Sequence, residues 1–80
     1  MTTKQLSQIE FFKLLEEKTV FLYYEYEDVC FRVFLNKSKN VDSFTKFRGE
    51  TEFATKRQSQ IFGVALDDPY EILKTDYDNF

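Results

Sequence analysis

Two runs of apolar and aromatic side chains in residues 20–35 flank a charged segment that contains Glu25, Glu27 and Asp28, and this pattern predicts a β-hairpin. With a two-residue turn at Glu27–Asp28, Val20 lies opposite Leu35, and every residue pair on that face is apolar or aromatic. A slip of one residue would move these side chains to the other face, so the pattern predicts that the register is fixed. Because Glu-Asp is a poor pair for a tight turn, the pattern also allows a loop that is one or two residues longer.

The second face of the predicted hairpin is half apolar, whereas antiparallel sheets commonly leave one face to solvent. This face carries Phe21, Tyr23 and Phe34, with Arg32 among them. The sequence leaves two alternatives open. The rings are either an exposed interface patch centred on Arg32, or they are covered by the C-terminal part of the chain. The residues predicted to form that cover are Phe62, Leu66, Tyr70 and Leu73.

Residues 4–17 have the spacing of an amphipathic helix with a wide apolar stripe. Ile9, Phe11, Phe12 and Leu15 fall within one arc, and Leu6 and Leu14 lie outside it. Two capping boxes fit the beginning of this helix, namely Thr2 with Gln5 and Ser7 with Glu10.

The middle of the chain predicts a loop and then a third strand. Residues 36–43 have the composition of a loop. Residues 45–53 predict a strand in which Gly49 forms a bulge. In an alternative interpretation, Arg48–Gly49–Glu50 is a turn between two short strands.

The last third of the chain predicts a strand and a helix. Residues 61–66 indicate a short buried strand, although periodicity does not exclude a helix in so short a run. Asp68 as a cap and Pro69 at the first helical position predict a C-terminal helix over residues 69–76. The expected fold is one α+β domain, residues 1–80, in which the N-terminal helix packs on a three- or four-stranded antiparallel sheet.

The composition excludes several classes of site. The chain has 80 residues, one cysteine and no histidine, so a histidine zinc site and an internal disulfide are both excluded. No apolar run is long enough for a membrane span, and no secretory signal is present. Together with the lone cysteine, these features predict a cytoplasmic protein without a metal or another cofactor.

The sequence predicts a protein that is not an enzyme. Cys30 has no histidine that could act as its base, and it lies within a predicted strand. Carboxylates occur at the hairpin tip and in residues 50–52, but neither group lies beside a predicted pocket. The two glycines stand alone, so no phosphate-binding loop is present.

The unusual features are the fifteen aromatic residues and an acidic C-terminal segment. Both favour a protein-binding module, because aromatic patches and acidic helices dock on partner surfaces. Size and composition also resemble those of small phage-type inhibitors of host nucleic-acid-binding proteins, and an exposed patch can also support a homodimer. The predicted partner-binding residues are Phe21, Tyr23, Arg32, Phe34, Asp67, Asp68, Glu71, Asp76 and Asp78.

An alternative function is binding of single-stranded nucleic acid by residues 36–57, which hold six basic and three acidic side chains. The basic residues are Lys37, Lys39, Lys46, Arg48, Lys56 and Arg57. Against this alternative, the whole chain carries a net charge of −3, and direct contact with nucleic acid is therefore less expected than contact with a protein.

Overall fold

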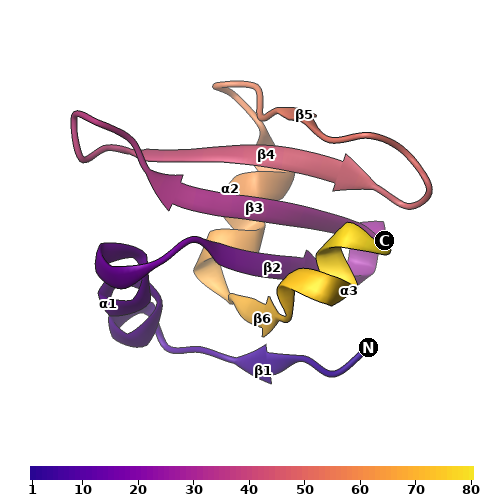
Figure 1. Cartoon of the computed structure of the whole chain (residues 1–80), viewed down its shortest axis with the longest axis horizontal. Coiled ribbons are helices and arrows are strands. Elements are labelled where there is room, and N and C mark those ends of the chain that lie inside the picture. The colour runs from indigo at the N-terminus through magenta and orange to yellow at the C-terminus, as the bar shows by residue number, and fades with distance from the viewer.

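The computed structural model describes all 80 residues, and it shows a six-stranded antiparallel sheet with three helices (Figure 1). In chain order the elements are β1 (Lys4–Gln5), α1 (Gln8–Glu17), β2 (Val20–Tyr24), a 3₁₀ turn (Glu25–Glu27), β3 (Val29–Leu35), β4 (Val41–Phe47), β5 (Phe53–Ala54), α2 (Gln60–Asp67), β6 (Tyr70–Ile72) and α3 (Lys74–Asp78). The strand order across the sheet is β1-β6-β2-β3-β4-β5. The predicted α+β class is confirmed, and the sheet is wider than predicted.

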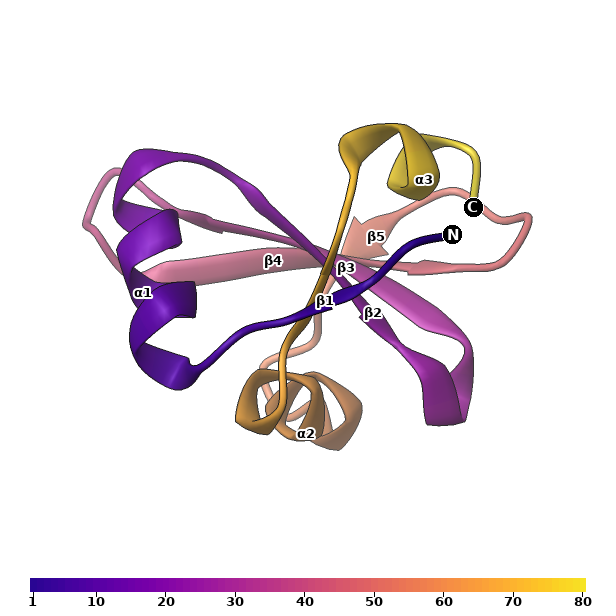
Figure 2. The ribbon, with the colours of Figure 1, turned by 90° about the horizontal axis from the view of Figure 1, so that it is seen from below.

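Helices lie on both sides of this sheet (Figure 2). Helices α1 and α2 cover one face, here called the α1/α2 face, and α3 lies on the opposite one, the α3 face. The main core lies on the α1/α2 face. Its buried members are Leu6, Phe11, Leu15, Val20, Leu22, Val29, Phe31, Val33 and Ala65.

Strands β2 and β3 form the predicted hairpin, but the pairing differs from the predicted one by two residues. Val20 pairs with Val33 instead of Leu35. The connection is longer because it contains the 3₁₀ turn and Asp28, whose φ of 49° is left-handed. Since side chains alternate with a period of two, a two-residue shift leaves both faces unchanged. The predicted faces are therefore confirmed for the paired residues.

Helix α1 begins later than predicted, at the second of the two capping boxes. The Ser7 hydroxyl accepts a hydrogen bond from the Glu10 N–H at 3.1 Å, and the Glu10 carboxylate accepts one from the Ser7 N–H at 3.0 Å. This exchange satisfies two amides at the helix start. Residues 4 and 5, predicted as helix, instead form β1 and pair with β6.

The predicted buried arc of this helix is partly wrong. Phe11 and Leu15 are buried as expected, and each contributes about 2 kcal/mol relative to an exposed position. Ile9 and Phe12 are exposed. Leu6 is buried, although it lies before the helix. Its N–H donates to the Pro69 carbonyl at 2.8 Å, which holds this segment beside the end of α2 and the start of β6.

The alternative interpretation of residues 45–53 is the correct one. Strand β4 ends at Phe47, and a turn at residues 48–50 separates it from the short strand β5. Gly49 occupies this turn with a φ of 76°, where a side chain would be strained. At its other end, β4 begins at Val41, inside the segment predicted as a loop.

Residues 61–66 form a helix and not the predicted strand. The Ser59 hydroxyl caps α2 by accepting from the Phe62 N–H at 3.2 Å. Ala65 is buried, and Phe62 and Leu66 pack against the main core beside it. Apolar side chains at spacings of three and four therefore face the sheet, which is the helical period.

The predicted helix over residues 69–76 is also wrong. Residues 70–72 form β6, which lies between β1 and β2 in the sheet. Helix α3 begins only at Lys74 and has five residues. Strand pairing to the free edge of β2 prevails over the local Asp-Pro capping signal, because tertiary pairing overrides weak local preference.

Candidate functional site

The C-terminal segment covers half of the aromatic face that the sequence predicted as a docking surface. The Phe21 ring lies 5.0 Å from the Tyr77 ring, and the Tyr23 ring lies 5.8 Å from the Phe80 ring, between centroids. Tyr77 and Phe80 are both buried there. Phe21 and Tyr23 are thus half-buried against a second small core, and their role as partner-binding residues stays a prediction of the sequence.

The residues that form this cover are not the predicted ones. Phe62 and Leu66 lie on the α1/α2 face, because residues 61–66 form a helix on that side. Leu73 is exposed. The cover consists of α3 and the residues that follow it, together with Ile72.

Three residues of β4 and the following turn hold the C-terminal segment in place. The Lys46 ammonium donates to the Tyr77 carbonyl at 2.8 Å and to the Asp78 carbonyl at 3.0 Å. The Gly49 N–H donates to the Phe80 carbonyl at 2.7 Å. The Arg48 guanidinium lies 4.3 Å from the centroid of the Phe80 ring. Lys46 and Arg48 are therefore engaged within the chain, although the sequence predicted them as nucleic-acid contacts.

The other half of this face remains uncovered. Phe34 of β3 and Phe44 of β4 stack with centroids 6.1 Å apart. The Arg32 guanidinium lies over both rings, 4.3 Å from Phe44 and 5.5 Å from Phe34. All three side chains are half-buried, and we call this surface the Phe34–Phe44 strip. Two of the predicted partner-binding residues, Arg32 and Phe34, belong to it.

Glu52 fixes the position of the Arg32 guanidinium. Two hydrogen bonds of 3.1 and 2.7 Å join the Arg32 nitrogens to the two Glu52 oxygens. Tyr77 donates its hydroxyl hydrogen to the same carboxylate at 2.6 Å. The bonds from Arg32, and next those from Tyr77, hold the pKa of Glu52 below its usual value. The Arg32–Glu52 ion pair thus connects the Phe34–Phe44 strip to Tyr77 in the covered half of the face.

A second ion pair closes the hairpin tip over the C-terminal residues. Arg48 donates to both Asp28 oxygens at 2.7 and 2.8 Å, and the Tyr23 hydroxyl donates to Asp28 at 2.8 Å. These hydrogen bonds lower the pKa of Asp28 to about 2, and those from Arg48 have the largest effect.

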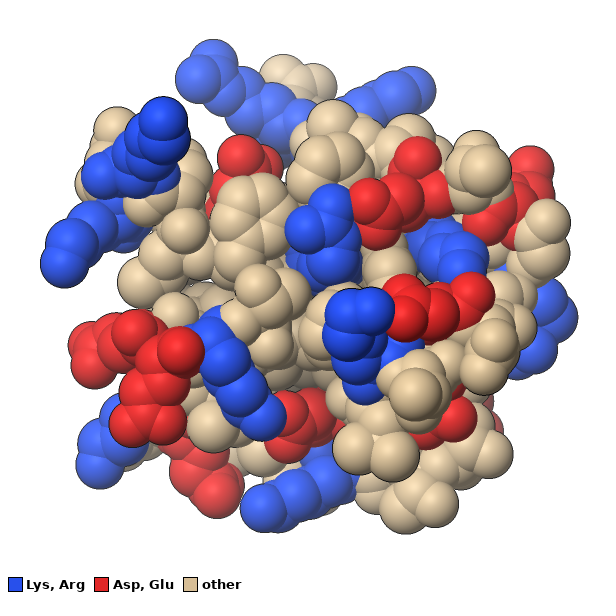
Figure 3. Space-filling model, viewed as in Figure 1, with Lys and Arg blue, Asp and Glu red and all other residues tan.

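Across the α3 face, acidic and basic side chains alternate, and no large surface of one sign forms (Figure 3).

The predicted acidic residues do not share one helix. Asp67 and Asp68 lie at the end of α2, and Glu71 lies in β6, where it pairs with Lys18 at 3.2 Å. Asp76 and Asp78 lie in α3, where Asp78 pairs with Lys74 at 2.6 Å. The structure thus distributes the five carboxylates over three elements.

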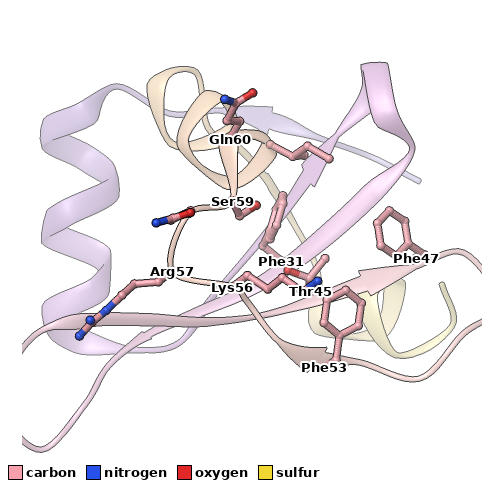
Figure 4. Close-up of a pocket in the computed structure, with 10 residues that line it drawn as sticks. Phe31, Thr45, Phe47, Phe53, Lys56, Arg57, Ser59 and Gln60 are labelled. Atoms are coloured by element: carbon pink, nitrogen blue, oxygen red, sulfur yellow. The ribbon is translucent and has the colours of Figure 1, made fainter.

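The predicted basic residues are also dispersed. Lys37 and Lys39 lie in the turn between β3 and β4, and Lys56 and Arg57 lie between β5 and α2. The last two line an open groove of about 540 Å³ beside the start of α2, which we call the α2 groove. Phe47 and Phe53 stack in its wall at 5.9 Å, whereas the Arg57 side chain points away from these rings (Figure 4).

Cys30 is fully buried between the sheet and α3. Burial raises the pKa of its thiol to about 12, so the thiol remains protonated at neutral pH. The carboxylates at the hairpin tip and in residues 50–52 are on the surface, and no three Cys, Asp or Glu side chains converge closely enough to hold a metal ion.

The sequence did not predict Phe44 as a residue of a docking surface or Glu52 as the partner of Arg32. Phe44 belongs to a segment that the sequence divided between a loop and a strand, so its face was not assigned. Glu52 was expected on a solvated strand face, but the turn at residues 48–50 brings it back over Arg32. The alternation of Val41–Phe47 in apolar and polar side chains was too weak a signal to place Phe44.

None of the three helices has both the length and the apolar character that crossing a bilayer requires. Comparisons of the chain with protein-family models, with curated proteins and with solved structures found no match.

Proposed function

We propose that this chain is a protein-binding module without catalytic activity, and that the Phe34–Phe44 strip is its docking surface. The observation that carries the proposal is the uneven cover of one sheet face. Tyr77 and Phe80 of the C-terminal segment pack on the half-buried rings of Phe21 and Tyr23. The equally half-buried, stacked rings of Phe34 and Phe44 next to them contact the Arg32 guanidinium instead. Contiguous exposed apolar surface on a small domain is typical of an interaction site.

The chemistry of the strip fits the centre of a protein interface. Aromatic rings and arginine are enriched among the residues that dominate binding energy. Arg32 donates two hydrogen bonds to Glu52 and lies over two rings, so its side chain has little conformational entropy left to lose on binding. Because Glu52 neutralises the guanidinium, we expect the partner to present an apolar or aromatic surface to the strip.

A non-enzymatic role is supported by the state of the candidate reactive groups. The only thiol is buried and protonated, and the ion-paired carboxylates Asp28 and Glu52 are bound to arginines. A role as an inhibitor of a host nucleic-acid-binding protein stays a prediction of the sequence. A carboxylate surface that imitates a phosphate backbone would need acids along one element, and α3 carries only two.

The test compares three forms of the tagged protein in capture experiments from the native host. We expect the wild-type chain to capture a specific protein, and the double variant Phe34→Ser/Phe44→Ser to lose it. The control is Phe12→Ser, because Phe12 is an equally large ring that is 47% exposed on α1, away from the strip. Capture that survives in the double variant, or is lost equally in the control, would contradict the proposal.

Sedimentation of the purified chain separates a partner protein from self-association. We expect a monomer over the accessible concentration range in both the wild type and the double variant. A wild-type dimer that the double variant abolishes would show that the strip binds a second copy of this chain instead.

A second candidate function is binding of single-stranded nucleic acid in the α2 groove. It is supported by one observation, the placement of Lys56 beside the stacked rings of Phe47 and Phe53. Rings that stack on bases and cations that contact phosphates are the usual elements of such sites. The measurement is an oligonucleotide titration at several salt concentrations. Affinity that does not fall steeply with salt, or that survives Lys56→Gln, would reject this candidate.

A further inference from the structure

A second concave surface lies at the tip of the β2–β3 hairpin, and it shares no residue with the Phe34–Phe44 strip. The hairpin tip bends toward the side of the sheet that α2 covers (Figure 2). Between this tip, the end of α2 and the start of β6 lies a hollow of about 420 Å³, here called the tyrosine hollow. Its lining residues are Thr3, Tyr23, Tyr24, Glu25, Tyr26, Val64, Asp68 and Tyr70.

Aromatic rings form much of the wall of this hollow. Tyr24 and Tyr26 lie with their ring centroids 5.7 Å apart, and Tyr70 comes from β6. Tyr26 is 87% exposed, so its ring makes little contact with the rest of the chain. The face of a tyrosine ring carries partial negative charge and attracts an organic cation within about 6 Å.

The charged groups of the hollow are both acidic. Glu25 and Asp68 are the only ionisable carboxylates in the lining, and no lysine or arginine lines it. Neither takes part in any of the four ion pairs of the chain. Asp68 accepts a hydrogen bond from the uncharged Gln5 amide at 2.7 Å.

The neighbouring lysine does not neutralise these carboxylates. Lys4 lines a separate hollow with Glu10, and its charge contributes to the lowered pKa of that residue. In the tyrosine hollow, by contrast, the charge of Asp68 is the largest cause of a raised pKa of Tyr70, and Glu25 acts in the same direction. The two lining carboxylates therefore produce a negative field at Tyr70.

We propose that the tyrosine hollow binds the cationic side chain of a lysine or arginine presented by a partner protein. Tyrosine faces and two free carboxylates together complement an ammonium or guanidinium group, and they repel an anion. Tyr26 is too exposed to enclose a small free ligand, whereas a side chain anchored on a protein needs no such enclosure. This proposal does not depend on the Phe34–Phe44 strip being a docking surface.

The test uses amide chemical shifts of the labelled chain during titration with two short peptides at low salt. One peptide alternates arginine and glycine, and the other replaces each arginine by the uncharged isostere citrulline. We expect saturable shifts around Tyr24, Tyr26 and Tyr70 with the arginine peptide only. Equal affinity for the citrulline peptide, or shifts that avoid the hollow, would overturn the proposal.

Matched variants separate the site from the general negative charge of the chain. Tyr26→Ala and Glu25→Gln should each weaken binding about threefold, and the double variant about tenfold. Glu27→Gln is the control, because it removes the same charge from an exposed residue of the same turn that does not line the hollow. Equal weakening by Glu25→Gln and Glu27→Gln would mean non-specific attraction and refute the site.

Two further measurements distinguish the source of the cation and the two binding surfaces. Tetramethylammonium is the probe for a small free cation, and tighter binding of this ion than of the arginine peptide would contradict a protein side chain as the occupant. The variant Phe34→Ser/Phe44→Ser should bind the arginine peptide like the wild type. Loss of peptide binding in that variant would show that the hollow is not an independent site.

Discussion

Asp28 illustrates how a single residue connects three parts of this molecule. Its left-handed backbone, with a φ of 49°, ends the 3₁₀ turn of the hairpin. Its carboxylate receives hydrogen bonds from Tyr23 on the adjacent strand and from Arg48 on the turn after β4. Arg48 in turn lies over the ring of Phe80. Asp28 therefore stabilises the hairpin tip and the attachment of the C-terminal segment together.

This arrangement predicts how stability depends on pH. The pKa of Asp28 falls from 3.8 to about 2 on folding, so its contribution is fully present above pH 4 and is lost as the pH falls toward 2. We expect the free energy of unfolding of Asp28→Asn to decrease less over this interval than that of the wild type, as measured by urea denaturation at several pH values. Glu27→Gln should follow the wild-type curve, because Glu27 forms no ion pair. If the free energy of unfolding of Asp28→Asn fell with pH as steeply as that of the wild type, this role of Asp28 would be contradicted.

At the scale of elements, α3 depends on its tertiary contacts. A helix of five residues is far below the length that is stable alone in water. Its first residues also lack a side-chain cap. What stabilises it is the burial of Tyr77 and of Phe80 just beyond its end, together with the Lys46 ammonium on its last carbonyls.

Tyr77 allows packing and hydrogen bonding to be separated. Tyr77→Ala should lower the free energy of unfolding by about 3 kcal/mol, because a large buried ring is lost. Tyr77→Phe should lower it by only about 1 kcal/mol, since Glu52 keeps its bonds to Arg32 when the hydroxyl is removed. Leu73→Ala, at an exposed position beside the helix, should change it by less than about 0.5 kcal/mol. Equal effects of the two Tyr77 variants in urea denaturation would contradict this division.

The two glycines predict opposite effects of one substitution. Gly49→Ala should destabilise the protein by about 1 kcal/mol, because its φ of 76° is unfavourable for a side chain even though the space is free. Gly63→Ala should stabilise it by up to about 1 kcal/mol, because Gly63 lies within α2 and an added methyl group meets nothing within 4 Å. Thermal denaturation of the two variants compares them directly. Effects of the same sign would contradict either the left-handed conformation of Gly49 or the helical position of Gly63.

At the scale of the whole molecule, both small cores depend on the same strands. Phe31 and Cys30 are neighbours in β3, and they point into the main core and into the core under α3 respectively. The two edge strands, β1 and β5, have only two residues each, which limits the edge available for pairing with another chain.

Because the two cores are built on the same strands, we predict a single cooperative unfolding transition. We expect tyrosine fluorescence, to which all five tyrosines contribute, and far-ultraviolet circular dichroism, which reports the sheet and helices, to give coincident urea curves. The chain has no tryptophan, so the tyrosine signal is not obscured. A fluorescence change that precedes the loss of secondary structure would contradict a single transition.

The sequence by itself determined the hairpin, its two faces and the α+β class, and it offered the Ser7 capping box as one of two. These features depend on contacts between residues close in the chain, where a period of two or a cap of three residues is visible directly. The same local patterns could not decide which of several overlapping apolar stripes on α1 is buried. They also could not tell a strand from a helix in residues 61–66, because both bury such a short apolar run.

Only the tertiary structure decided how the anomalous sheet face is used. Residues 70–72 become a strand because β2 offers them an unpaired edge, and this places Tyr77 and Phe80 over Phe21 and Tyr23. The extra turn at residues 48–50 brings Glu52 back to Arg32 and leaves Phe34 and Phe44 uncovered. Such outcomes depend on pairings between residues 20 to 67 positions apart. No local period encodes the balance of apolar burial against chain entropy that selects these pairings.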